Sequence, residues 1–142
     1  MKKCSKCKLN KSILEFGKQQ CRPDGLYPFC AECLKTENLK YKRSFSGFIN
    51  TMYGNMKRRV LDRQCIYWYG LPILSKEKFC FWINRNNKFK RLYKNWVTNN
   101  YDKRLTPSID RIDSSKGYLL GNIQVIGTQD NRFKALIKRW GL

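Results

Sequence analysis

Residues 107–126 read PSIDRIDSSKGYLLGNIQVI, and this stretch decides how the chain is interpreted. Residues 108–112 and residues 123–126 predict two short strands, and the residues between them, which include Gly117 and Gly121, predict a loop. A helix is expected from about Thr128 to Arg139, because its large apolar residues recur at helical spacing. The stretch therefore predicts a strand, a loop, a second strand and a helix, in that order.

The expected last helix has two different faces. Asn131, Lys134 and Lys138 are spaced i, i+3 and i+7, so they share one face. The other face carries the large apolar side chains of Phe133, Leu136, Ile137 and Trp140. We expect this apolar face to be turned inward, which leaves Lys134, and more weakly Lys138, available for an anion.

This pattern resembles the core of the ββα-metal (HNH-type) endonucleases, in the variant written D-R-x-D-x-x-x-G-Y-x-x-x-N with an Asn-x-x-Lys on the helix. Such cores occur in small phage endonucleases, in homing-type enzymes and in a rare-cutting restriction endonuclease with a similar N-terminal zinc knuckle. The close match covers about 35 residues, which include the stretch from Pro107 to Lys134. The cysteine-rich start of the chain extends the likeness over most of its length.

The resemblance implies a role for four residues. Asp110 and Asn131 are the expected ligands of a catalytic divalent metal, and Asn122 is the expected tie of the loop between the strands. Arg111 stands where the family usually has its general-base histidine. Because a guanidinium is always protonated, we expect Arg111 to orient the attacking water and to clamp the phosphate, rather than to accept a proton.

Elementary chemistry supports this reading of Asp110 and Asn131. A carboxylate and an amide oxygen are hard ligands that suit Mg²⁺ or Mn²⁺, which keep several waters and take further contacts from substrate phosphate. Such a metal polarises the scissile phosphate and stabilises the leaving oxygen. The alternative is that Asp110 and Asp113 belong to a salt-bridged turn.

Two C-x-x-C pairs near the N-terminus predict a second, separate metal site. Cys4 and Cys7, followed by Cys30 and Cys33, have the spacing of a structural Zn²⁺ site. Two disulfides or a redox dithiol are the alternative, but a reducing compartment argues against them. Cys21 lies between the two C-x-x-C pairs and remains open as a substitute zinc ligand. Cys65 and Cys80 are expected to be small buried apolar residues.

Composition limits the possible functions. The 142 residues include 30 Lys and Arg, 10 Asp and Glu and no His, which gives a formal net charge of +20. The lack of histidine excludes Ser-His-Asp triads, Cys-His nucleophiles and His-ligated zinc sites. The charge favours a polyanionic partner. No apolar stretch is long enough to span a bilayer and no signal peptide is recognisable, so we expect a cytoplasmic protein that does not enter a membrane.

Three segments are expected: residues 1–45 with the zinc knuckle and a first helix from about Ala31, residues 46–105 with basic helices, and residues 106–142 with the ββα core. Residues 46–105 carry 13 basic and 3 acidic side chains. A helix that begins near Ser46 should bury Phe48, Met52, Met56 and Val60, and a helical region capped by Ser75 should reach about Val97. Trp68, Trp82 and Trp96 are expected in the core. The expected DNA-backbone contacts, besides Lys134 and Lys138, are Lys57, Arg58, Arg59, Arg63, Lys88, Lys90, Arg91 and Lys94.

The sequence thus predicts a small α+β protein with a Cys₄ zinc knuckle, a helical middle and a C-terminal ββα-metal nuclease motif. The function expected from it is metal-dependent hydrolysis of phosphodiesters in double-stranded DNA, as a sequence-specific restriction or homing type of endonuclease. One site nicks one strand, so a double-strand cut requires a homodimer or two sequential nicks. A non-catalytic zinc-containing DNA-binding protein is the first alternative, and an RNA-binding or ribosome-associated zinc protein is the second.

Overall fold

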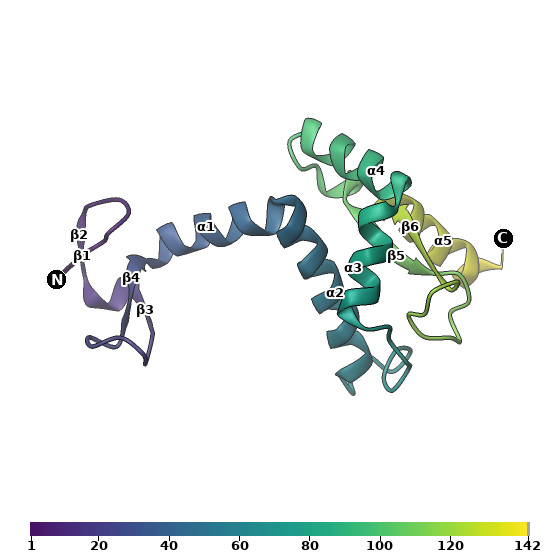
Figure 1. Cartoon of the computed structure of the whole chain (residues 1–142), viewed down its shortest axis with the longest axis horizontal. Coiled ribbons are helices and arrows are strands. Elements are labelled where there is room, and N and C mark those ends of the chain that lie inside the picture. The colour runs from purple at the N-terminus through teal and green to yellow at the C-terminus, as the bar shows by residue number, and fades with distance from the viewer. Residues whose placement is uncertain (142) are drawn as a thin grey trace. The chain divides into compact units, whose positions relative to one another are not determined.

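A computed structural model describes residues 1–141, apart from the side chain of Lys138. The chain divides into two compact units, residues 1–48 and residues 49 onward (Figure 1). The predicted basic helices and the predicted strands therefore lie in the same unit.

The first unit consists of two small antiparallel hairpins and one helix. Its elements are β1 (Lys2–Lys3), β2 (Asn10–Lys11), the 3₁₀ helix η1 (Ile13–Glu15), β3 (Phe16–Lys18), β4 (Leu26–Cys30) and α1 (Ala31–Arg43). Strand β1 pairs with β2, and β3 pairs with β4. The buried centre is small and contains Cys4, Phe16 and Cys30. Two cysteines thus fill positions that large apolar side chains occupy in larger domains.

The second unit contains four α-helices and a third antiparallel hairpin, counted over the described residues. Its elements are α2 (Phe45–Leu61), which begins in the first unit, α3 (Lys76–Arg85), α4 (Asn87–Thr98), η2 (Lys103–Leu105), β5 (Pro107–Arg111), β6 (Ile123–Gly127) and α5 (Thr128–Trp140). Figure 1 shows β5 and β6 beside α5 near the C-terminus. The small α+β class is confirmed, and β5, β6 and α5 follow in the predicted order.

The hairpin positions the residues that the sequence singled out. Strand β5 pairs with β6 so that Asp110 lies opposite Gln124 and Arg111 opposite Ile123. Both α4 and α5 contact the two strands. The loop between the strands approaches the chain after α2, where the backbone amide of Tyr118 donates to the carbonyl oxygen of Pro72 at 2.9 Å. A Cβ on Gly117 would lie 1.9 Å from that oxygen, so only glycine fits there.

The apolar stripe of α2 is formed as predicted. Phe48, Met52, Met56 and Val60 are all buried, whereas Leu61 at the end of the helix is 64% exposed. Of the three tryptophans expected in the core, only Trp96 is buried, and Trp68 and Trp82 are half-buried. The prediction for these two residues is wrong in part, because each lies at the edge of a surface depression.

Two further features differ from the sequence prediction. The helical region that begins after Ser75 is interrupted at Asn86, whose side chain accepts a hydrogen bond from the amide of Phe89 at 2.8 Å and so begins α4 as a new helix. The predicted orientation of α5 is wrong. Its apolar residues are exposed, with 64% of Phe133 and 69% of Trp140 accessible. The hydrogen bonds to β5 come instead from Asn131 and Lys134, so the polar face is turned to the hairpin.

Candidate functional site

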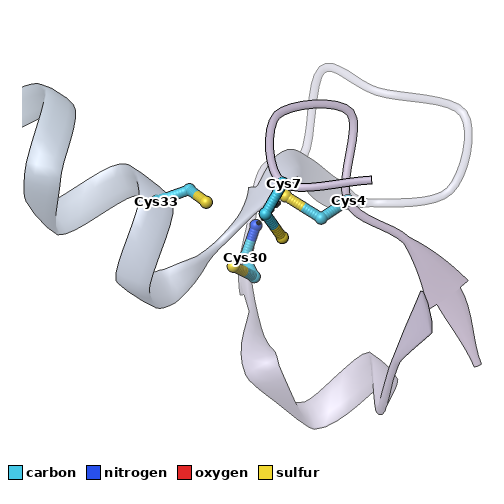
Figure 2. Close-up of side chains that lie close together, drawn as sticks. All are labelled: Cys4, Cys7, Cys30 and Cys33. Carbon is cyan, nitrogen blue, oxygen red and sulfur yellow. Dashed lines mark hydrogen bonds between the residues drawn. The ribbon is translucent and has the colours of Figure 1, made fainter. Parts of the chain in front are cut away.

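Four cysteine side chains of the first unit converge on one point. Cys4 and Cys7 come from the turn after β1, Cys30 from the end of β4 and Cys33 from the first turn of α1 (Figure 2). Their sulfur atoms all lie within 4.8 Å of one another. Four ligands about 2.3 Å from a Zn²⁺ ion in a tetrahedron have separations of about 3.8 Å, so the cluster has the size of such a site.

Hydrogen bonds and burial shift the pKa values of two of these thiols in opposite directions. The amide of Cys30 donates to Sγ of Cys4 at 3.3 Å. Burial raises the pKa of Cys4, but backbone amides that hydrogen-bond to its sulfur lower it by more, to about 6. The pKa of Cys33 is raised to about 12 by its hydrogen bond to Cys30 and by burial. Cys4 is therefore a thiolate at neutral pH, as a metal ligand has to be.

The four cysteines could hold a structural metal ion such as zinc. None of the seven cysteines, all of which lie among the described residues, forms a disulfide. Cys21 is exposed and does not belong to the cluster, so it is not one of the four converging side chains. Cys65 and Cys80 are half-buried, which agrees only in part with the buried positions expected of them.

A cleft in the second unit brings together most of the predicted catalytic residues. Its volume is about 670 Å³. Asp110 and Arg111 from β5 and Asn131 and Lys134 from α5 line it. The remaining lining residues are Arg59, Tyr67, Trp68, Ile109, Ile112, Ser114, Tyr118, Ala135 and Arg139. The cleft thus has one carboxylate and four cationic side chains, a composition that suits an anion.

Asp110 lies at the centre of a small polar network. Its Oδ2 atom accepts hydrogen bonds from Nε2 of Gln124 at 2.8 Å and from Nζ of Lys134 at 2.7 Å. Lys134 also donates to the carbonyl oxygen of Arg111 at 3.0 Å. Sequence reasoning missed Gln124, although the hairpin register places it directly opposite Asp110 on the same face. The side chain of Asp110 is 12% exposed, so this carboxylate is shielded from solvent and neutralised by Lys134.

Asn131 and Asn122 have different surroundings. Nδ2 of Asn131 donates to Oγ of Ser108 at 3.2 Å, which leaves its amide oxygen as an acceptor at the cleft. Asn122 is buried, accepts from the amide of Asp113 at 2.9 Å and donates to the carbonyl oxygen of Gly117 at 2.9 Å. Asn122 therefore ties the loop from within, which is the role expected of it.

Asp113 belongs to the loop and not to the cleft. Its Oδ1 atom accepts from the amide of Ser115 at 2.9 Å, and its carboxylate lies 3.4 Å from Nζ of Lys116. The hydrogen bonds from Ser115 and the contact with Lys116 lower the pKa of Asp113. The alternative of a salt-bridged turn describes this residue.

Arg111 is held between aromatic rings. It is 7% exposed, and Nη1 donates to the carbonyl oxygen of Lys116 at 2.9 Å. The guanidinium carbon lies 5.5 Å from the ring centre of Trp68 and 5.6 Å from that of Tyr118. These contacts fix the guanidinium in the cleft wall, because cation–π attraction is strongest where water is excluded.

The predicted DNA-contact residues fall into separate groups. Arg59 lines the cleft, where Nη1 donates to the hydroxyl of Tyr118 at 3.3 Å. Lys134 lies in the same cleft, whereas the side chain of Lys138 is outside the described residues. The remaining predicted residues are exposed on α2, on the turn after it and on α4, namely Lys57, Arg58, Arg63, Lys88, Lys90, Arg91 and Lys94.

Comparisons with known proteins add no assignment: no protein-family model, no curated protein and no solved structure matches this chain. Across the described residues, the helices lack either the length or the apolar character required to span a bilayer.

Proposed function

We propose that the protein is a metal-dependent DNA endonuclease of the ββα-metal (HNH) type, whose N-terminal unit is stabilised by zinc. One observation carries the proposal: Asp110 and Asn131, two residues that lie 21 positions apart, line the same cleft together with several cations. This composition suits a divalent metal bound between protein oxygens and a phosphodiester.

Within this proposal, each polar residue of the cleft has a role. Asp110 and the amide oxygen of Asn131 hold Mg²⁺ or Mn²⁺, which supplies Lewis-acid polarisation of the phosphate when bound. Arg59 and Lys134 attract the backbone of the DNA. Arg111 keeps a fixed positive charge beside the phosphate and orients the attacking water, because its guanidinium is held in place by Trp68 and Tyr118.

The four cysteines have a structural role in the proposal. A Zn²⁺ ion with four thiolate ligands has no open coordination position for substrate. The buried centre of the first unit is so small that metal ligation supplies much of its stability. Zinc therefore stabilises a unit that presents basic residues, while hydrolysis takes place in the cleft of the second unit.

The deciding experiment follows the cleavage of supercoiled plasmid in Mg²⁺, in Mn²⁺ and in EDTA. Wild-type protein should nick or linearise the plasmid with either metal and not in EDTA, whereas Asp110→Ala and Asn131→Ala should be inactive. Asp130→Asn is the matched control, since Asp130 is exposed on α5 one residue before Asn131. Arg111→Ala should cut slowly, and a wild-type rate for this variant would show that its proposed role is wrong.

A second candidate is a non-catalytic zinc-containing DNA-binding protein. It is favoured by the contact between Nζ of Lys134 and Oδ2 of Asp110, because an ammonium group there competes with a divalent metal. Duplex binding in a gel-shift assay, with no cleavage under either metal, would support this candidate against the endonuclease.

A further inference from the structure

Four consecutive large side chains stand beside the cleft on an irregular segment between α2 and α3. They are Ile66, Tyr67, Trp68 and Tyr69, and we call them the aromatic loop. Ile66 is 73% exposed, Tyr67 is 74% exposed and Tyr69 is 48% exposed. Single exposed apolar residues are common on protein surfaces, but a contiguous exposed group marks a site of contact with another molecule.

The backbone of this loop is held in a defined conformation. The amide of Cys65 donates to the carbonyl oxygen of Asp62, and the amide of Tyr69 donates to that of Cys65, each at 2.9 Å. The loop closes where the amide of Gly70 donates to the carbonyl oxygen of Val60, also at 2.9 Å. Gly70 has a φ of +75°, which glycine adopts without strain. The exposed side chains are thus presented by a fixed turn.

Trp68 anchors the loop to the cleft. Its ring receives the guanidinium of Arg111 at 5.5 Å and that of Arg59 at 6.0 Å. Tyr67 packs edge-on against Trp68, with ring centres 6.0 Å apart and an interplanar angle of 86°. Tyr67 therefore has one side supported by the protein, while 74% of its surface is exposed.

Tyr67 and Trp68 line the same cleft as Asp110 and Asn131. A phosphodiester bound in this cleft joins two nucleotides, so the bases of these nucleotides come within reach of the aromatic loop. Aromatic rings beside cationic side chains are the arrangement that proteins use to bind unstacked bases. Apolar wedges such as Ile are inserted between base steps by proteins that kink the duplex.

We infer that the aromatic loop opens the base stack next to the phosphate that is cut, with Tyr67 stacked on a displaced base and Ile66 placed in the gap. The inference deepens the proposed endonuclease function and rests on it. It names a substrate class: duplex DNA that is kinked or locally unstacked at the cleavage point, which is cut in preference to a regular, stiff duplex. Tyr67 and Ile66 are positioning residues and do not take part in the chemistry.

The charge around the loop favours nucleic acid over a protein partner. Arg59 and Arg111 contact Trp68, and Arg63 is exposed three residues before Ile66. The segment from Lys57 to Tyr69 holds a single acidic residue, Asp62. A second copy of this chain would bring the same cations together, so like charges would oppose its docking on this face.

The test uses duplex oligonucleotides in which 2-aminopurine replaces adenine at successive positions, because its fluorescence rises when it is unstacked. Binding is measured without added Mg²⁺ or Mn²⁺, so that no cleavage occurs, and without a chelator, which would remove zinc from the first unit. Wild-type protein should raise the fluorescence several-fold at one or two positions that flank the displaced base, because these bases lose a stacking neighbour whereas the displaced base is stacked on Tyr67. Tyr67→Ala and Ile66→Ala should abolish the rise in fluorescence, and Tyr67→Trp should retain it. The affinity of Tyr67→Ala for the duplex should be lower by at least about fivefold.

The matched control is Phe81→Ala, which removes an aromatic side chain that is 62% exposed on α3 and lines a different depression. Thermal melting of each variant checks that it is folded. A duplex with an abasic site should restore binding and cleavage to Tyr67→Ala, because its base stack is already interrupted. If Tyr67→Ala gives the wild-type fluorescence rise and the wild-type preference for abasic over regular duplex, the inference is wrong.

The outcomes separate this inference from the proposed function. A fluorescence rise that depends on Tyr67, without cleavage in any metal, supports the loop's role and contradicts the endonuclease. Cleavage that depends on Asp110, with no effect of Tyr67→Ala, supports the endonuclease and contradicts the role of the loop. Loss of a dimer in Tyr67→Ala by light scattering, with no change in fluorescence, would make the loop a protein interface and overturn the inference.

Discussion

Nζ of Lys134 lies 2.7 Å from Oδ2 of Asp110, so the carboxylate expected to bind a metal is paired with a lysine of the facing helix. Both residues belong to the cleft, one from α5 and one from β5. In the absence of a divalent cation, Lys134 neutralises a carboxylate that is 12% exposed. Under the proposed function, a metal ion that binds Asp110 would release Lys134 to contact a phosphate, so metal binding and DNA binding would be coupled.

This coupling predicts that Lys134→Met changes the affinity for Mn²⁺ and the affinity for DNA in opposite directions. Lys134→Met should bind Mn²⁺ about fivefold more tightly without DNA, because the competing attraction of the half-exposed Lys134 for Asp110 is about 1 kcal/mol. The same variant should bind duplex DNA more weakly and with a shallower salt dependence, since one phosphate contact is lost. Isothermal titration with Mn²⁺ and salt-dependent gel shifts measure the two effects. Lys103→Met is the control, and an Mn²⁺ affinity equal to that of wild type in Lys134→Met would contradict the prediction.

The cysteine cluster predicts a stoichiometric metal content. Purified protein should contain one zinc ion per chain, and Cys4→Ser or Cys30→Ser should lose it, because each removes one of the four converging sulfurs. The first unit should then become sensitive to proteolysis, since Cys4 and Cys30 are also buried at its centre. Cys21→Ser should keep full zinc content, because Cys21 is exposed outside the cluster. Elemental analysis decides the point, and zinc loss in Cys21→Ser would show that a different ligand set is used.

The depressed pKa of Cys4 predicts a pH-dependent release of protons on zinc binding. The pKa of Cys4 is about 6, so above this pH Cys4 is already a thiolate and has no proton to release. As the pH falls through 6 it becomes protonated, so its contribution to zinc affinity is present above this pH and is lost below it. Calorimetry in two buffers of different ionisation enthalpy should find about one more proton released at pH 5 than at pH 7.5. Equal release at both values would contradict the depressed pKa.

The close approach of Gly117 to Pro72 predicts that one added methyl group at residue 117 lowers the stability of the protein markedly. Gly117→Ala would place a Cβ 1.9 Å from a backbone oxygen, so the loop has to move. We expect the free energy of unfolding to fall by more than about 2 kcal/mol. Gly54→Ala is a matched control within α2, where a Cβ meets nothing within 4 Å, and it should raise the stability by about 0.5–1 kcal/mol. Chemical denaturation of the two variants gives the comparison, and equal stabilities would contradict the role of the contact.

The sequence by itself determined the local features. Short segments on either side of a glycine-containing loop predicted β5 and β6, helical apolar spacing predicted α2 and α5, and the C-x-x-C spacing predicted the four cysteines that converge. These features depend on residues that are near one another in the chain, so periodicity and spacing suffice to find them. The nuclease function and the catalytic metal remain proposals, for which Asp110 and Asn131 are the test positions.

Only the tertiary structure decided which faces meet. Phe133 and Trp140 of α5 are exposed, because Asn131 and Lys134 form the hydrogen bonds to β5, and helical periodicity alone cannot tell which face is turned inward. Trp68 lies beside Arg111 although 43 positions separate them, and no local pattern reports such a contact. Gln124 becomes a partner of Asp110 only through the register of the hairpin. Composition provided the charge, and packing between distant segments decided which of those charges surround the cleft.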